Sequence, residues 1–250
     1  MTVIVDGIAT NYVQEGSGPT VVLLHGWGDS LKTFDGLAKS LKRNYTVVRL
    51  DLPGFGGSDA PKETFSLSKY AAFTADFLNK IGQEHIYAYL GHSNGGAVCI
   101  KGLASGVLCS DKLVLIASAG IRSDYQGKKK VLRLAAKAAK LPTNLLPKQT
   151  QNKLKKRVYG AIGSDLFVAE HLQDTFKKVV SEDVVAEAAM IAQPTLILYG
   201  KQDTATPPNY GERYAHQIEK SNLIILDCAG HFVHHDASTK VHTAIEEFLV

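Results

Sequence analysis

The segment GHSNG, residues Gly91–Gly95, indicates the fold class through the residues on either side of it. Ile86–Leu90 before it is a short apolar run typical of a buried strand, and Gly95–Ser105 after it has helical periodicity. A serine flanked by glycines between a strand and a helix is held on a sharp turn, with its hydroxyl exposed at the end of the strand. The pattern predicts that Ser93 is a nucleophile, and the alternative is a tight turn with an incidental serine.

Outward from this turn, apolar strands alternate with helices over residues 1–120 and again over residues 191–250. The predicted strands are Thr20–Leu24, Tyr45–Leu50, Ile86–Leu90, Leu113–Ile116, Thr195–Tyr199 and Leu223–Leu226, after an N-terminal ribbon of Val3–Val5 and Ala9–Gln14. The predicted helices are Phe34–Leu41, Ser68–Ile81, Gly95–Ser105, Pro207–Lys220 and Ser238–Leu249. This alternation predicts an α/β fold, with a mostly parallel central sheet and helices on both faces.

Residues 121–190 break the alternation, because they contain helical patterns and no convincing strand. Helices are predicted there at Lys128–Lys140, Lys148–Tyr159 and Ser164–Val180. The sequence therefore predicts one α/β core in two parts, residues 1–120 and 191–250, interrupted by an all-helical cap at residues 121–190.

The predicted cap is also the basic part of the chain. Residues 121–158 hold 12 Lys or Arg and one acid, whereas the net charge of the whole chain is only +4. Lys130, Arg133, Lys137 and Lys140 recur at helical spacing, opposite apolar residues. A solvated helix face explains this stripe. The functional alternatives are attraction for an anionic substrate and attraction for a membrane surface.

Candidates for a general base and its carboxylate follow two later strands. A serine hydroxyl is a poor nucleophile until a base takes its proton. His231 comes just after the strand Leu223–Leu226, and Asp203 comes just after the strand Thr195–Tyr199. Because parallel strands end at one edge of the sheet, both side chains are expected near Ser93, in the chain order serine, acid, histidine. Asp203 would fix the tautomer of the imidazole and stabilise the imidazolium as it forms.

Two alternatives concern the carboxylate. The alternative role for Asp203 is that of an acidic residue before the N-terminus of the helix Pro207–Lys220. Thr206 is the expected N-cap of that helix. Asp227 is the competing acid, but it stands in the same loop as His231 and close to it along the chain. Asp203 is therefore the predicted partner of the histidine.

The oxyanion that forms when a serine attacks a carbonyl needs hydrogen-bond donors. Asn94 follows the nucleophile at a helix N-terminus, where backbone N–H groups favour negative charge. Trp27 lies in the segment HGWG that follows the strand Thr20–Leu24, near enough to supply a second donor. The backbone N–H groups of Trp27 and Asn94 are the predicted oxyanion hole. The Trp27 side chain is either a pocket wall or simple packing, and His25 is expected to shape the loop.

Five segments resemble the α/β-hydrolase superfamily, in this order along the chain: HGWGDS (25–30), DLPGFGGS (51–58), GHSNGG (91–96), GKQD (200–203) and AGH (229–231). The resemblance covers residues 1–120 and 191–250. Within the superfamily the chain is similar to the small, lidded esterases and carbon–carbon hydrolases. In that family an insertion after the sixth strand forms a helical cap over the active site, which the resemblance implies for residues 121–190.

Composition and residue spacing argue against several other classes of protein. The chain is 45% hydrophobic and 21% charged, as in ordinary globular proteins, and has no run of about 20 apolar residues that a membrane helix needs. The N-terminus lacks a signal-peptide pattern and the three cysteines lack metal-binding spacing, so we expect a cytoplasmic protein with reduced thiols. His231, His234 and His235 have no completing ligands, so no metal is expected. Neither nucleic-acid binding nor membrane association is expected.

The predicted function is hydrolysis of small-molecule carboxylic esters with small or medium acyl groups, through an acyl-enzyme on Ser93 and without a cofactor. The resemblance also implies an alternative at the same three residues, namely carbon–carbon bond hydrolysis of dienoic keto acids. An alternative from a different class is a ligand sensor that keeps these residues but hardly turns over. Measured turnover separates a sensor from an enzyme, and a panel of esters and dienoic keto acids separates the two hydrolases.

Overall fold

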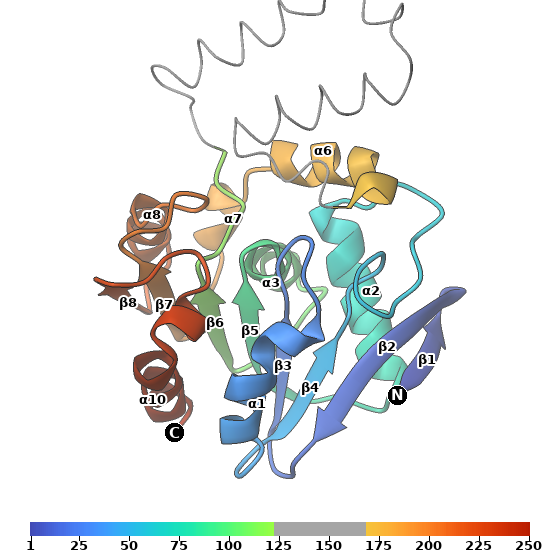
Figure 1. The fold of residues 1–250 in the computed structure, drawn as a ribbon, viewed down its shortest axis with the longest axis horizontal. Helices are drawn as coiled ribbons and strands as arrows, with labels where there is room; N and C mark the ends of the chain where they lie inside the picture. The colour runs from blue at the N-terminus through green and yellow to red at the C-terminus, as the bar shows by residue number, and fades with distance from the viewer. Residues whose placement is uncertain (123–168) are drawn as a thin grey trace, which may run out of the picture.

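A computed structural model of the protein describes residues 1–122 and 169–250, which are built around an eight-stranded sheet (Figure 1). The strands are β1 (Thr2–Val5), β2 (Ile8–Glu15), β3 (Thr20–Leu24), β4 (Thr46–Leu50), β5 (Ile86–His92), β6 (Lys112–Ile116), β7 (Thr195–Gly200) and β8 (Ser221–Leu226). Their order across the sheet is β1-β2-β4-β3-β5-β6-β7-β8. The first two strands run antiparallel to their neighbours, and all later pairs are parallel.

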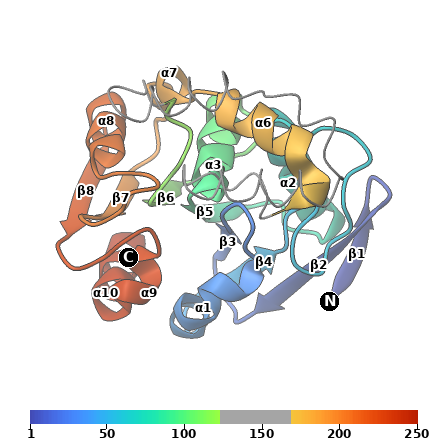
Figure 2. The same cartoon turned by 45° about the horizontal axis from the view of Figure 1, so that its top comes forward.

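Helices cover both faces of this sheet (Figure 2). They are η1 (Leu31–Phe34), α1 (Asp35–Leu41), α2 (Leu67–Lys80), α3 (Asn94–Ala104), η4 (Glu170–Leu172), α6 (Gln173–Ser181), α7 (Val185–Ala188), α8 (Asn209–Gln217), α9 (Val233–Asp236) and α10 (Ser238–Leu249). Buried residues of α1 and α10 pack on one face, and those of α2, α3 and α8 pack on the other. The predicted fold class, a mostly parallel sheet with helices on both faces, is confirmed.

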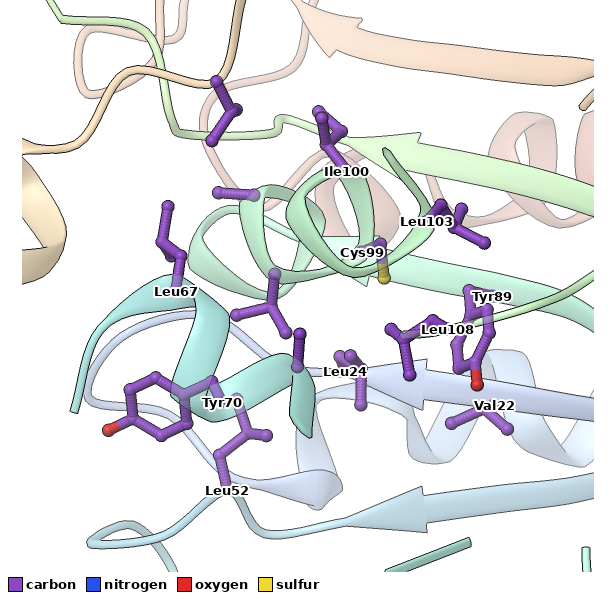
Figure 3. Close-up of a cluster of buried hydrophobic side chains, with 14 of the residues drawn as sticks. Val22, Leu24, Leu52, Leu67, Tyr70, Tyr89, Cys99, Ile100, Leu103 and Leu108 are labelled. Carbon is purple, nitrogen blue, oxygen red and sulfur yellow. The ribbon is translucent and has the colours of Figure 1, made fainter. Parts of the chain in front are cut away.

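The central strands have no polar face because each of their faces meets a layer of helices. In β3, Val21 and Leu23 belong to the cluster that contains α1 and α10, whereas Val22 and Leu24 belong to the cluster under α2 and α3 (Figure 3). All four side chains are fully buried. A run of apolar residues such as Val21–Leu24 is what a strand between two helical layers requires.

Most predicted elements are found within a few residues of their expected bounds, and Thr20–Leu24 and Ser238–Leu249 match fully. The prediction for Pro207–Lys220 was wrong at its start, because α8 begins at Asn209 with Pro208 at the N-cap. Thr206 does not cap this helix, since its hydroxyl is engaged elsewhere.

Part of the predicted cap cannot be compared with the fold. The helices Lys128–Lys140 and Lys148–Tyr159, with their basic stripe, lie outside the described residues. The predicted helix Ser164–Val180 is described only in its second half, as η4 and α6. The division into a core (1–120 and 191–250) and a cap (121–190) therefore stays a prediction.

One edge of the sheet collects the carboxyl ends of the parallel strands β3 to β8. Figure 1 shows α6 on the side of the molecule where these strands end, above α3 and α2. Ligands of α/β proteins bind at this edge. Of the helices described, none combines the length and the apolar character that crossing a membrane would demand.

Candidate active site

Ser93 lies on the turn between β5 and α3 in an unusual backbone conformation, with φ of +50° and ψ of −116°. Residues other than glycine rarely have positive φ, and they keep it only where neighbours enforce it. The N–H of Ser93 donates to the carbonyl of Ile116 (3.0 Å), and its own carbonyl accepts from the N–H groups of Gly96 (3.0 Å) and Ala119 (2.9 Å). The backbone of β6 therefore helps to hold Ser93 in the strained turn.

Glycines on either side of Ser93 allow the helix to come close to two strands. A Cβ on Gly95 would overlap the carbonyl oxygen of Leu24 and lie 2.7 Å from that of His25. A Cβ on Gly91 would lie 2.5 Å from the Cα of Gly96. These neighbours are backbone atoms, so no side-chain rotation relieves the overlap. The flanking glycines are thus required by packing, as the sequence pattern predicted.

The variant Gly95→Ala is expected to lower the free energy of unfolding by about 1–3 kcal/mol, because the added methyl group overpacks a backbone contact. Gly36→Ala is the matched control, since Gly36 is also the second residue of a helix, α1. Its Cβ would lie no closer than 3.6 Å to another side chain, so the control is expected to be neutral or stabilised by up to about 1 kcal/mol. Urea unfolding midpoints measure both. Equal midpoints for Gly95→Ala and Gly36→Ala would contradict the close approach of Gly95 to the backbone of Leu24 and His25.

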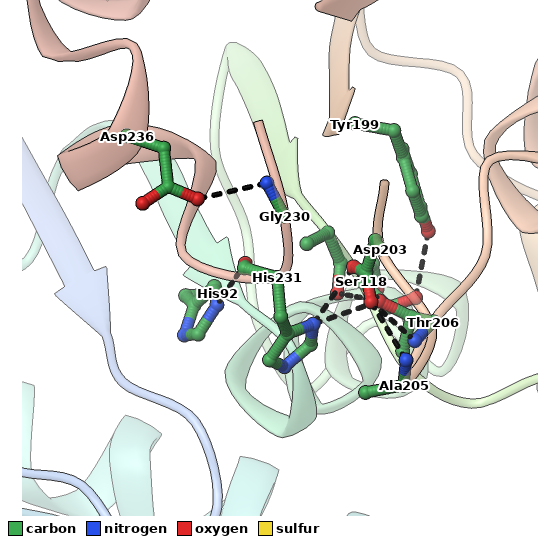
Figure 4. A network of polar contacts seen from close by, with 10 residues as sticks. His92, Ser118, Tyr199, Asp203, Ala205, Thr206, Gly230, His231 and Asp236 are labelled. Atoms are coloured by element: carbon green, nitrogen blue, oxygen red, sulfur yellow. Dashed lines mark hydrogen bonds and ion pairs between the residues drawn. The ribbon is translucent and has the colours of Figure 1, made fainter. Parts of the chain in front are cut away.

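His231 and Asp203 form a hydrogen-bonded pair at the ends of β8 and β7. The distance between His231 Nδ1 and Asp203 Oδ2 is 2.8 Å (Figure 4). The side chain of Asp203 is fully buried, whereas that of His231 is 22% exposed. Asp203 Oδ1 accepts the backbone N–H groups of Ala205 (2.8 Å) and Thr206 (2.9 Å). The Asp203 carboxylate therefore binds both the backbone of the turn before α8 and the imidazole of His231.

The charge state of Asp203 follows from these contacts. Burial raises the pKa of its carboxyl, but the hydrogen bond and charge of His231 and the donors of Thr206 outweigh burial, so the net pKa is lowered. An ionised carboxylate can only accept, so the proton of a neutral His231 lies on Nδ1. Its Nε2 then carries the free lone pair that a general base needs.

The competing acid Asp227 is placed elsewhere. Its carboxylate is 79% exposed and pairs with Lys201 Nζ at 2.8 Å. No hydrogen bond joins Asp227 to His231 in the part of the chain that the structure describes. The geometry thus favours Asp203 over Asp227.

His92 connects the serine turn to the histidine loop. Its Nε2 donates to the backbone carbonyl of His231 (3.1 Å), and the two rings lie 4.9 Å apart (Figure 4). Burial lowers the pKa of His92 well below its ordinary value, so the ring is neutral. Ser93 Oγ has no hydrogen-bond partner within residues 1–122 and 169–250. Catalytic hydrogen bonds often tighten only when substrate binds.

The loop after β3 passes beside the serine. A Cβ on Gly26 would lie 3.1 Å from Ser93 Cβ, so the chain from Gly26 to Trp27 runs next to the nucleophile. The backbone N–H groups of Trp27 and Asn94 donate to no other residue in the described ranges. Two free donors at such a position suit an oxyanion.

The model of the alpha/beta hydrolase family matches residues 21–244. The chain belongs to this family. It is 26% identical to the pimeloyl-[acyl-carrier protein] methyl ester esterase of Nitrosomonas europaea, over 86% of this chain and 90% of the esterase. Over a shorter part, 46% of this chain and 41% of the relative, it is 31% identical to a 2-hydroxy-6-oxo-6-(2'-aminophenyl)hexa-2,4-dienoic acid hydrolase of Metapseudomonas resinovorans.

Solved structures show the same fold. The enol-lactonase of Burkholderia xenovorans LB400 superimposes with a TM-score of 0.77 at 20% identity, covering 100% of this chain and 99% of the lactonase. The meta-cleavage product hydrolase of Pseudomonas fluorescens IP01 gives a TM-score of 0.76 at 20% identity, with 99% and 96% covered. At such identities these structures show the fold alone.

Two buried side chains shape the loops around the site of this α/β hydrolase. His25 donates from Nδ1 to the carbonyl of Gly26 (2.7 Å), and its Nε2 accepts the N–H of Leu52 (3.0 Å). Asp51 accepts the N–H groups of Leu31 and Gly57, both at 2.7 Å. His25 therefore has the loop-shaping position that the sequence predicted.

The Trp27 side chain packs between the core and α6. Its ring centroid lies 4.9 Å from that of Phe55 and 5.1 Å from that of Phe176 in α6. Its Nε1 is buried and has no hydrogen-bond partner among the residues that the structure describes, and the same is true of Oδ1 and Nδ2 of Asn94. Nearby, Thr175 Oγ1 of α6 accepts the N–H of Phe65 (3.1 Å). These contacts fix α6 on the core beside the predicted oxyanion loop.

Two further histidines, His234 and His235, follow His231 closely along the chain. Nε2 of both His234 and His235 lies within reach of Thr33 Oγ1, at 3.1 and 3.2 Å. Burial and the neighbouring His235 lower the pKa of His234 to about 3. Within the described ranges, no three His, Cys, Asp or Glu side chains are grouped to hold a metal ion.

Sequence analysis missed two contacts of His231. It gave no role to His92, whose ring nitrogen Nε2 contacts the backbone carbonyl of His231. It assigned Thr206 to a helix cap, although Thr206 Oγ1 lies 2.8 Å from Asp203 Oδ2 and 3.1 Å from His231 Nδ1. The three-residue spacing from Asp203 to Thr206 is a signal for such a turn, because Asp and Thr side chains bond to nearby backbone and to each other.

Proposed function

We propose that this hydrolase cleaves carboxylic esters of small or medium acyl groups through an acyl-enzyme on Ser93. The observation that carries the proposal is the 2.8 Å contact between His231 Nδ1 and a fully buried Asp203 carboxylate. It stands at the same sheet edge as a serine in the strained turn typical of a nucleophile. The alignment with an ester hydrolase over 86% of this chain supports the ester as substrate.

In the proposed mechanism, Ser93 Oγ attacks the ester carbonyl carbon while His231 Nε2 takes the hydroxyl proton. The carbonyl oxygen becomes an oxyanion, which the backbone N–H groups of Trp27 and Asn94 stabilise. His231 returns the proton to the alkoxide leaving group, and an acyl-serine and an alcohol result. A water molecule then attacks the acyl carbon while His231 takes a proton from it. His231 returns this proton to Ser93 Oγ as the bond to the acyl group breaks, which releases the acid and restores the enzyme.

The role of Asp203 in this mechanism is to keep His231 in the tautomer that accepts a proton at Nε2. Its lowered pKa keeps it ionised, so it stabilises the imidazolium that forms in both steps. His92 supports the same ring from the other side by binding the backbone of His231.

A fluorophosphonate probe tests the nucleophile. We expect covalent labelling of Ser93 alone, because the proposed base activates only that hydroxyl. Digestion and mass spectrometry locate the adduct. An adduct on another serine, or none on an enzyme that hydrolyses a short-chain aryl ester, would overturn the assignment of Ser93.

Carbon–carbon bond hydrolysis of a dienoic keto acid is the second candidate. The 31% identity to a dienoic acid hydrolase over 121 residues favours it. The same nucleophile, base and acid would serve that reaction. Steady-state kinetics on a panel of aryl and alkyl esters and dienoic keto acids separates the two, since a higher kcat/KM for the keto acids would replace the ester proposal.

A ligand sensor with very low turnover is the alternative outside enzymes. Binding of an ester analogue without measurable hydrolysis of any substrate in the panel would favour the sensor. An acyl-enzyme observed by mass spectrometry and released with time would exclude it.

A further inference from the structure

The hydroxyl of Thr206 joins the ends of three strands. Its Oγ1 lies 2.9 Å from the carbonyl oxygen of Ala117, 2.8 Å from Asp203 Oδ2 and 3.1 Å from His231 Nδ1. These partners follow β6, β7 and β8 in turn (Figure 4 shows Thr206 with Asp203 and His231). Thr206 itself is 5% exposed, so water does not compete for its hydroxyl.

A hydroxyl has one proton, so its three contacts cannot all be donations. Asp203 Oδ2 and Ala117 O are both acceptors, and the charged oxygen takes the stronger hydrogen bond. Thr206 therefore donates to Asp203 when the carboxylate is ionised. The 3.1 Å contact then leaves a lone pair of Oγ1 facing the N–H of His231.

This donation completes the environment of Asp203. A carboxylate offers about four acceptor directions. Oδ1 takes the backbone N–H groups of Ala205 and Thr206, and Oδ2 takes His231 Nδ1–H and the hydroxyl of Thr206. With both oxygens fully engaged, the carboxylate has no alternative orientation that keeps its hydrogen bonds.

We propose that Thr206 is a positioning residue, whose hydroxyl fixes the Asp203 carboxylate and, through it, the orientation and tautomer of His231. The inference rests on the proposed function, because it assigns His231 the role of base. Thr206 touches neither the serine nor, by its burial, the substrate. Its effect should therefore fall on kcat and on the pH dependence, and not on KM.

Two pairs of proteins isolate the hydroxyl. Thr206→Val, compared with wild type, replaces the hydroxyl by a methyl group and keeps the shape of the side chain. Thr206→Ala, compared with Thr206→Ser, differs only by loss of the hydroxyl from a smaller side chain. We expect kcat for a short-chain aryl ester to fall on the order of tenfold in both hydroxyl-free variants, the scale of a hydrogen bond to a charged group. Thr206→Ser is expected within about threefold of wild type, and KM is expected unchanged throughout.

The pH profile separates positioning from packing. Without the hydroxyl, Asp203 Oδ2 loses a donor and the N–H of His231 loses a facing lone pair, so the electrostatic surroundings of the imidazolium change. The acid limb of kcat/KM is therefore expected to move in Thr206→Val and Thr206→Ala, and to stay in place in Thr206→Ser. Titration of His231 followed by NMR gives the same comparison without any substrate.

Several outcomes would overturn the inference. Thr206→Val with wild-type kcat and an unmoved acid limb contradicts it. Equal losses in Thr206→Ser and Thr206→Ala would assign the effect to the missing methyl group. Failure of both Val and Ala variants to fold, judged by circular dichroism while Ser folds, would assign the hydroxyl to stability alone. A wild-type protein without turnover or labelling of Ser93 would instead contradict the proposed function, and the NMR titration would still test Thr206.

Discussion

Ser93→Ala is expected to lower kcat by about 10⁴- to 10⁶-fold while leaving the fold intact, because removal of a nucleophile leaves only the contribution of binding and of the oxyanion donors. The fold should survive because the serine turn is held by backbone contacts to Ile116, Gly96 and Ala119, and all of them remain in the variant. Ser93 Oγ donates to no other residue that the structure describes, so alanine removes no structural hydrogen bond among them.

The measurement combines kinetics with a stability control. Turnover of a short-chain aryl ester, fluorophosphonate labelling and the urea midpoint are compared with those of Ser105→Ala, which removes an exposed serine at the other end of α3. We expect that control to keep wild-type activity and labelling. Retention of more than about one per cent of wild-type turnover by Ser93→Ala would exclude an obligatory acyl-serine.

The core was predictable because burial leaves a strong mark on the sequence. A strand between two layers of helices must be apolar on both faces, and Val21–Leu24 satisfies that rule residue by residue. An amphipathic helix is as clear, and in α2 a serine, Ser66, precedes the first turn and its Oγ accepts the N–H of Lys69. Local patterns of this kind were therefore enough to predict the fold class.

The pairing of Asp203 with His231 was predictable for a different reason. Topology alone brings the ends of β7 and β8 to the same edge as Ser93, so chain order and strand position were enough to select both residues. Side-chain orientation was not available from the sequence. The contacts of Thr206 and His92 were therefore missed, because they depend on how neighbouring loops turn in three dimensions.

Asp203→Asn is expected to lower kcat by about 10⁴-fold without loss of the fold, and the local hydrogen bonds give the reason. The N–H groups of Ala205 and Thr206 both point at Oδ1, so the amide oxygen of the variant must occupy that position. Its NH₂ group then faces His231 Nδ1. An NH₂ donor requires a lone pair on Nδ1, which moves the proton of the neutral ring to Nε2.

A histidine protonated at Nε2 cannot accept the proton of Ser93, so the variant holds the wrong tautomer even though every residue keeps its place. Asp227→Asn is the matched control, because it makes the same change of charge at a carboxylate that is 79% exposed and paired with Lys201. We expect the control to keep kcat within about twofold of wild type, since exposed ion pairs contribute little. Circular dichroism and the urea midpoint establish that both variants fold. A crippled Asp227→Asn beside an active Asp203→Asn would move the acid of the site to Asp227, and the buried 2.8 Å contact would then be structural only.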